Sequence, residues 1–327
     1  LGLVALIMLG AATAITAYFP SMGGILTLTM LSSIGFHYYE TVNQSLQLQW
    51  IETARAPQMI GWLMAAGSAV TFVAYVLIVM TWEALGLSYA FVYMVSGGIT
   101  VAIAVFCLFA YPQFEAPHPQ LKTFVLRRRY WLYYALQFMA GARRQIFVVF
   151  AGFMMVEKFG FQVHEVTSLY LLTLMTNVVV APMMGRLVSV FGERRALLFE
   201  YLGLILVFLA YGGVYFFGWG VAIAATLYVI DNIFFALALA LKTYFQKIAD
   251  PGDIAPTAAV AFTINHIAAI LLPALIRNLI LHCTGVVFIP GSWIDSYQFS
   301  ITLCALPLSA TRHTLPSHPP SPSPRGV

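Results

Sequence analysis

The chain has 327 residues, of which 61% are hydrophobic and only 9% are charged. Soluble domains contain about 45–50% apolar and about 25% charged residues, so this composition excludes an ordinary soluble domain and indicates a polytopic membrane protein. The formal net charge of +4 is small and scattered over short polar segments, which argues against nucleic acid as a partner.

Nine segments are long and apolar enough to be transmembrane helices, which need about 20 residues each. In chain order they are Leu1–Phe19, Gly24–Gln47, Gln58–Trp82, Ser88–Tyr111, Trp131–Val156, Val166–Val188, Ala196–Phe217, Gly220–Phe245 and Thr257–Leu281. The predicted fold is an all-α polytopic transmembrane helical bundle. The chain opens directly in the first apolar segment without a basic region, so we expect a fragment that begins partway through a longer protein.

The basic residues of the short loops predict the orientation of these spans. Arg55, the cluster Arg127–Arg129 and the pair Arg194–Arg195 fall on one side, and Lys158 and Arg277 fall on the other. The richer side is expected to be cytoplasmic. Residues 112–130 then form a cytoplasmic linker between two helical bundles, 1–111 and 131–282, and the Pro- and Ser-rich residues 283–327 form an atypical, disordered or aberrant tail.

An internal repeat supports the division into two bundles. Thr27-Leu28 matches Thr226-Leu227, and the same offset relates Ala56-Pro57 to Ala255-Pro256 and Gln47 to Gln246. Membrane transporters are often built from two such repeated halves.

Two adjacent arginines, Arg143 and Arg144, lie near the middle of the apolar segment Trp131–Val156. Each charge at that depth costs roughly 2.5–3.5 kcal/mol on insertion scales, so the two side chains must face protein or water. An ionisable residue in such a position is a functional-site hypothesis by default.

The loop after the sixth apolar segment carries a recognisable motif, Gly185-Arg-Leu-Val-Ser-Val-Phe-Gly-Glu-Arg-Arg195. It resembles the loop motif of the major facilitator superfamily, roughly G-x-L-x-D-R-x-G-R-R. The matching residues are Gly185, Leu187, Gly192, Arg194 and Arg195. Ser189, Val190 and Glu193 replace the Asp, Arg and Arg of the motif, which puts its charge-relay role in doubt.

The resemblance covers roughly residues 1–281 and implies that the nine segments are helices three to eleven of an expected twelve. It also implies a secondary active transporter that moves a small solute by alternating access, with a proton as a candidate coupling partner. The expected setting is a bacterial-type inner or plasma membrane that the chain crosses several times. No cofactor and no oligomer are implied.

In such transporters helices one, four, seven and ten line the central cavity, and the polar residues fall mainly on their counterparts here. The candidate pathway residues are His37, Glu40, Gln44, Arg143, Arg144, Asp231 and Asn232. His37, Glu40 and Gln44, together with Ser33, share one helical face by spacing.

Alternatives remain open for several of these side chains. A structural ion pair between one arginine and Asp231 is the alternative to a solute or ion role. For His37, a satisfied core histidine is favoured over a group that titrates near physiological pH. Glu40 is equally compatible with a solvated or gating role. Asn265 and His266 are expected to make interhelical hydrogen bonds instead of ligand contacts.

Two other classes of protein compete with a transporter. A polytopic membrane protein without transport activity, such as an inactive fragment or a receptor-like protein, is the first alternative. An integral membrane enzyme is less favoured, because the sequence contains no HExxH or GxSxG motif. ATP-driven transport is not expected either, because the sequence contains no GxxxxGK[ST] loop. The three cysteines form no CxxC pair and no cluster with histidines, so neither a zinc site nor a disulfide framework is implied.

Overall fold

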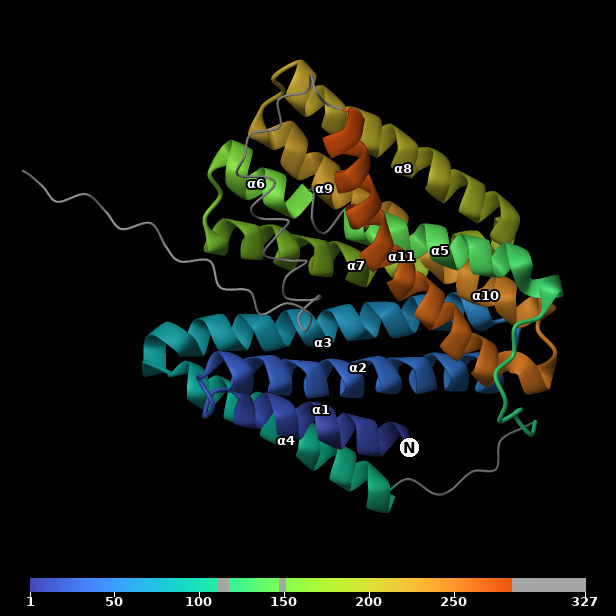
Figure 1. Cartoon of the computed structure of the whole chain (residues 1–327), viewed down its shortest axis with the longest axis horizontal. Helices are drawn as coiled ribbons and strands as arrows, with labels where there is room; N and C mark the ends of the chain where they lie inside the picture. The colour runs from blue at the N-terminus through green and yellow to red at the C-terminus, as the bar shows by residue number, and fades with distance from the viewer. Residues whose placement is uncertain (111–117, 147–150, 284–327) are drawn as a thin grey trace, which may run out of the picture. The chain divides into compact units, whose positions relative to one another are not determined.

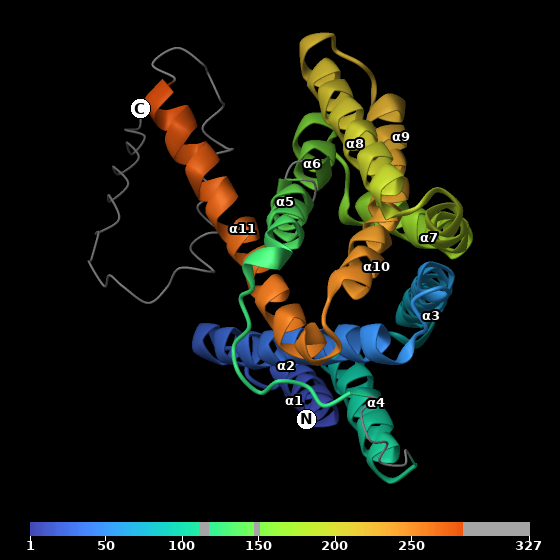
Figure 2. The same cartoon turned by 90° about the vertical axis from the view of Figure 1, so that its right-hand side faces the viewer.

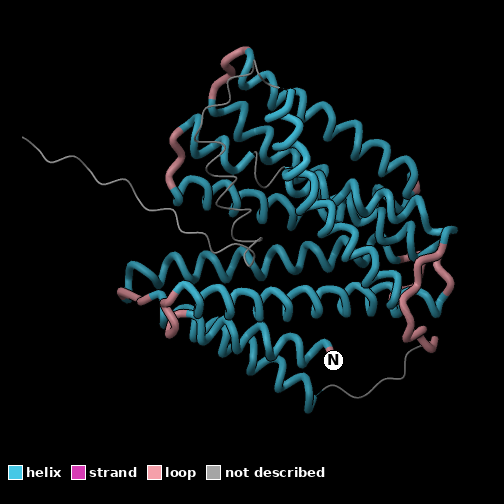
Figure 3. The backbone as a smooth tube through the Cα atoms, in the orientation of Figure 1, coloured by secondary structure: helices cyan, strands magenta, loops and turns pink. Residues whose placement is uncertain are grey.

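The computed structural model describes residues 1–110, 118–146 and 151–283, and every regular element in these ranges is helical (Figure 3). The chain divides into two compact units, Leu1–Ala274 and Leu275–Val327. All side chains discussed below belong to the first unit. The predicted tail lies outside the described residues from 284 onward.

The first four helices are α1 (Gly2–Thr16), α2 (Met22–Trp50), α3 (Ala56–Leu85) and α4 (Tyr89–Ala110). Local sequence sets their ends. Ser21 caps α2 by accepting a hydrogen bond from the Gly24 amide at 3.1 Å. α3 ends at Gly86, whose φ of 58° is left-handed. Figure 1 shows α1 packed along α2 and α4.

The later helices vary more in length, from 8 residues in α6 to 30 in α11. They are the 3-10 turn η1 (Arg128–Tyr130), α5 (Trp131–Ile146), α6 (Gly152–Phe159), α7 (Val163–Phe191), α8 (Glu193–Phe216), α9 (Val221–Phe235), η3 (Ala236–Ala238), α10 (Leu239–Ile248), η4 (Pro251–Asp253) and α11 (Ile254–Cys283). The predicted span Trp131–Val156 therefore contains α5 and part of α6, with residues 147–150 outside the described ranges. The predicted span Gly220–Phe245 contains α9 and α10, separated by η3.

The helix boundaries agree with the internal repeat. An offset of 199 residues relates the start of α2 at Met22 to the start of α9 at Val221. The same offset carries Ala56, the first residue of α3, to Ala255, the second residue of α11. The two copies differ at one point, because α2 is continuous where its counterpart is interrupted by η3.

A close helix crossing joins α3 to α7, and the two lie side by side in Figures 1 and 2. A Cβ atom on Gly61 would lie 2.6 Å from the carbonyl oxygen of Ala181, and one on Gly185 would lie 2.5 Å from that of Pro57. Only glycine permits this approach of the two backbones. Gly185 of the loop motif thus has a packing reason for its identity.

Five helical segments of the described residues are long and apolar enough to cross a membrane. They are Ala56–Trp82, Tyr89–Ala110, His164–Phe191, Glu193–Val214 and Val221–Ile248. The other four predicted spans fall on α1, α2, α5–α6 and α11. An all-α membrane protein is confirmed, and the number of nine spans stays a prediction.

Residues 118–130 are fastened to the turn between α10 and α11. The Tyr130 hydroxyl donates to Oδ2 of Asp253 at 2.9 Å and accepts from the amide of Asp250 at 3.0 Å. Arg127 donates to Oδ1 of Asp253 at 2.9 Å, and Arg129 pairs with Asp250 at 2.8 Å. The hydrogen bond from Arg127 holds the pKa of the Asp253 carboxyl below its usual value, and burial raises the pKa of Tyr130. We call this group of five residues, Arg127, Arg129, Tyr130, Asp250 and Asp253, the linker clip.

Candidate functional site

Arg144 of α5 contacts His266 of α11, and the hydrogen bonds assign the protonation of the ring. Nη2 of Arg144 lies 3.4 Å from Nε2 of His266, whose Nδ1 lies 2.9 Å from the carbonyl oxygen of Phe262. A guanidinium only donates and a carbonyl only accepts, so Nδ1 carries the hydrogen and Nε2 is the acceptor. The ring of His266 is thereby oriented from both sides, by Arg144 and by the Phe262 carbonyl.

His37 of α2 contacts the same part of α11. Its ring packs edge-on against His266, with centroids 4.5 Å apart, and against Phe262 at 5.3 Å. Nδ1 of His37 is buried and has no hydrogen-bond partner among the described residues. We call His37, Arg144 and His266 the histidine junction, because it joins one of the first four helices to two of the later ones.

Glu40, one helical turn from His37, is the acidic group near this junction. It lies within electrostatic range of His37, Arg144 and Lys242, which come from α2, α5 and α10. Lys242 forms no ion pair with a described carboxylate within 4.0 Å. The surroundings of Glu40 therefore contain more fixed positive than negative charge.

Arg143 faces a different set of partners from its neighbour. Its Nη2 lies 3.6 Å from Oε1 of Glu200 on α8, and its guanidinium lies 4.6 Å from the ring centroid of Phe235. Asp231 of α9 is within electrostatic range of Arg143, but the ion pair among the described residues is the one with Glu200. Arg143, Glu200 and Asp231 are 7%, 3% and 1% exposed. We call these three residues the buried triad.

Sequence reasoning missed Glu200, although a usable signal was present. Glu200 is a lone carboxylate inside the apolar segment Ala196–Phe217, which is the same kind of anomaly that singled out Asp231. The predicted interhelical role of Asn265 and His266 is confirmed, because Asn265 donates to the carbonyl oxygen of Gln137 at 3.1 Å and His266 contacts Arg144.

The structure does not bring the remaining pathway candidates into these clusters. The Asn232 amide donates to the carbonyl oxygen of Tyr228 on its own helix at 3.2 Å. Gln44 is half-buried on α2, and Ser33 is exposed on the same helix.

The loop motif lies between α7 and α8. Gly192 has a φ of 79°, so this position favours glycine, while Arg194 and Arg195 are exposed. Glu193, which departs from the motif, pairs with Lys247 of α10 at 2.6 Å. The departure therefore provides an ion pair that joins the start of α8 to the end of α10.

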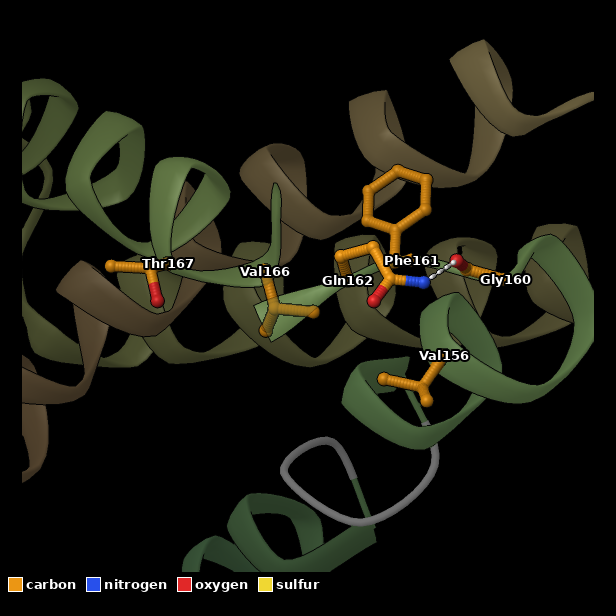
Figure 4. A pocket seen from close by; sticks show the side chains of 6 residues that line it. All are labelled: Val156, Gly160, Phe161, Gln162, Val166 and Thr167. Atoms are coloured by element: carbon orange, nitrogen blue, oxygen red, sulfur yellow. Dashed lines mark hydrogen bonds between the residues drawn. The ribbon is translucent and has the colours of Figure 1, made fainter. Parts of the chain in front are cut away.

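A hollow of about 490 Å³ lies elsewhere, between the end of α6 and the start of α7 (Figure 4). Its walls are formed by Val156, Gly160, Phe161, Gln162, Val166 and Thr167. In Figure 4 the Gln162 amide donates to the carbonyl oxygen of Gly160. None of these side chains is ionisable, and none is a predicted pathway residue.

Comparison with protein families decides the class of this molecule. The sequence model of the Major Facilitator Superfamily matches residues 1–273. The chain belongs to this superfamily. It is therefore a multi-pass integral membrane protein of a transporter family that moves small solutes, and it is not an enzyme. No curated protein matches the chain in a direct comparison.

Proposed function

We propose that this superfamily member is a secondary active transporter in which residues 1–111 and 131–282 are two bundles that rock about a central solute site. The observation that carries the proposal is the histidine junction. It places a guanidinium and two titratable rings where one of the first four helices meets two of the later ones. A solute at this junction would contact both bundles, as alternating access requires.

Depth supports the same conclusion. At 1.5 Å rise per residue, His37 lies about 20 Å from the end of α2 at Trp50, and Arg144 lies about 20 Å from the start of α5. His266 lies about 18 Å from the start of α11 by the same count. A bilayer core is about 30 Å thick, so all three residues belong near its middle.

The residues that we propose to line the solute pathway are the predicted ones: His37, Glu40, Gln44, Arg143, Arg144, Asp231 and Asn232. The excess positive charge around Glu40 supports a role for the junction in binding. The register of helices three to eleven and the bacterial-type inner or plasma membrane belong to the same proposal.

A hydrogen-bonded contact between α10 and the end of α2 supports the alternating-access mechanism. Nε2 of Gln246, on α10, donates to the carbonyl oxygens of Leu48 at 2.9 Å and Ile51 at 2.6 Å. These carbonyls lie at the C-terminal end of α2, where a helix leaves its last acceptors unsatisfied. Gln246 therefore ties the end of α2 to α10, and an opening between the bundles on this side has to break the tie.

Uptake into proteoliposomes tests the proposal. A panel of anionic, neutral and cationic solutes is screened first with the intact protein. Arg144→Ala is then expected to abolish uptake of the transported solute while membrane insertion is retained. Arg128→Ala is the control, because Arg128 is exposed outside the predicted spans. Unchanged uptake by Arg144→Ala would contradict the site, and binding without any flux would favour a receptor-like protein.

A further inference from the structure

We infer that Arg143, Glu200 and Asp231 form a binding site for one proton, distinct from the histidine junction. The inference deepens the proposed function by naming a coupling ion and the residues that hold it. Proton binding itself does not depend on that function, since the triad lies entirely within the later helices α5, α8 and α9.

Burial is the first observation. All three side chains are more than nine-tenths buried, and the distance between Nη2 of Arg143 and Oε1 of Glu200 is 3.6 Å. Oε2 of Glu200, Oδ1 of Asp231 and all three guanidinium nitrogens of Arg143 have no hydrogen-bond partner among the described residues. The triad is a buried polar cluster with unused donors and acceptors.

Charge is the second observation. Two carboxylates face one guanidinium, so full ionisation would leave one uncompensated negative charge. A buried ionised carboxylate without a partner costs several kcal/mol, and it usually takes up a proton instead. Because Glu200 and Asp231 interact with each other and with Arg143, the proton belongs to the pair and not to either residue alone.

Among the described side chains, no other charged group supplies the missing positive charge. The side chains that face the triad electrostatically are Tyr201 and Tyr211 of α8 and Tyr228 of α9, with Tyr170 of α7 behind Tyr228. Phenols are neutral near pH 7, since their unperturbed pKa is about 10.

The cations of the adjacent helices are engaged elsewhere. Arg144 turns to His266, and Lys242 lies near Glu40. Lys247 pairs with Glu193, and Lys158 of α6 donates to the carbonyl oxygen of Val214. Glu157 of α6 is exposed. The charge imbalance of the triad is therefore not cancelled by its surroundings.

Glu193 provides an internal comparison on the same helix. It is 8% exposed, but it has a cation of its own, Lys247, at 2.6 Å. A carboxylate with one cation is balanced when ionised, so Glu193 needs no proton. The difference between Glu193 and the triad lies in the ratio of carboxylates to cations and not in burial.

The position of Arg143 links the proton site to the solute site electrostatically. Arg143 precedes Arg144 directly on α5, and the two guanidinium groups interact electrostatically. Loss of the proton strengthens the negative field that holds Arg143, and this change reaches α5 one residue from the histidine junction. Occupancy of the triad is thereby linked to the arginine that contacts α11.

Infrared spectroscopy tests the site without any knowledge of the solute. The protein in liposomes is titrated from mildly alkaline to mildly acidic pH while the C=O stretch of protonated carboxyl groups is recorded. We expect a band that titrates in the unmodified protein and is lost in Glu200→Gln and in Asp231→Asn. Glu193→Gln is the control and is expected to keep the band.

The experiment distinguishes failure of the proton site from failure of the solute site. A band that persists in both isosteric variants, or its absence from the unmodified protein, overturns the proton site. A band that requires sodium, tested by replacing sodium with choline, assigns the site to a metal cation and also overturns it. If Arg144→Ala retains full uptake but the band behaves as expected, the solute site fails and the proton site stands.

Discussion

Arg143 and Arg144 are neighbours in sequence with separate roles in the fold. Successive residues of a helix point about 100° apart, so two adjacent side chains cannot share one environment. Arg143 turns to Glu200 and Asp231, and Arg144 turns to His266. One pair of residues therefore connects the buried triad to the histidine junction through a single peptide bond.

The free energy of unfolding should depend strongly on Arg143. Arg143→Ala leaves two buried carboxyl groups without a cation, and removal of one partner of a buried ion pair costs about 3–5 kcal/mol. Adding Glu200→Gln to that variant is expected to restore part of the loss. Chemical unfolding in detergent measures both effects. Simply additive losses in the double variant would show that the two side chains do not interact.

Single residues were predictable from sequence where they were anomalies. Arg143, Arg144 and Asp231 stand out in apolar segments, and the structure buries Arg143 and Asp231. Their partners were not predictable, because pairing depends on which helices are neighbours. Glu200 rather than Asp231 forms the ion pair, since α8 as well as α9 faces α5 at this level.

At the scale of elements, the continuous helices α2 and α8 were placed within a few residues by hydropathy. The segment Gly24–Gln47 became α2 (Met22–Trp50), and Ala196–Phe217 became α8 (Glu193–Phe216). The interruption at Ala236–Ala238 was not predicted, because no glycine or proline marks it. An apolar sequence indicates that a segment is buried or lies in lipid, but it does not indicate whether the helix is continuous.

The α3–α7 crossing should be sensitive to a single methyl group. Gly61→Ala and Gly185→Ala each place a Cβ against a carbonyl oxygen, and overpacking of this kind costs about 1–3 kcal/mol. Gly67→Ala is the matched control on α3, because no atom lies within 4 Å of its added Cβ. Thermal unfolding in detergent distinguishes them, and equal effects at all three positions would contradict the crossing.

The linker clip should respond to acid in a defined direction. The pKa of Asp253 is lowered by Arg127, so its stabilising effect is complete above its ordinary value of 3.8 and is lost as the pH falls through the lower folded value. Asp253→Asn is therefore expected to lower the unfolding temperature at neutral pH, and the difference from the unmodified protein should shrink in strong acid. A difference that grows in acid would exclude this assignment.

At the scale of the whole molecule, Gln246 should control access from one side. Gln246→Ala removes both hydrogen bonds to α2, so a cysteine introduced at Ser45 should react several-fold faster with a membrane-impermeant maleimide. Gln47→Ala is the control, because the repeat-related Gln47 contacts Asn43 on its own helix at 3.4 Å. Equal labelling in both variants would show that Gln246 is not a closing contact.

The class of the whole molecule was predictable from composition and one loop motif. The superfamily and the all-α membrane fold are confirmed over residues 1–273. The number of spans was harder to predict. The polar residues expected to line a cavity on α2 also lower its hydropathy, and α2 is not among the helices apolar enough to count as a span. His37, Glu40 and Gln44 are the residues that produce this conflict.

The glycine crossing of α3 and α7 also has a mechanical consequence. Gly61 lies only five residues from the start of α3 and twenty-four from its end at Leu85. These distances correspond to arms of about 8 Å and about 36 Å. The close approach at Gly61 and Gly185 holds the two backbones together beside the packed side chains of Ile60 and Val188, so the crossing can serve as a fulcrum with unequal arms. A tilt that shifts the short arm by about 1 Å would move the far end by more than about 4 Å. The ring contact between Tyr75 and Tyr170, centroids 5.5 Å apart, lies on the long arm and would be among the first to separate.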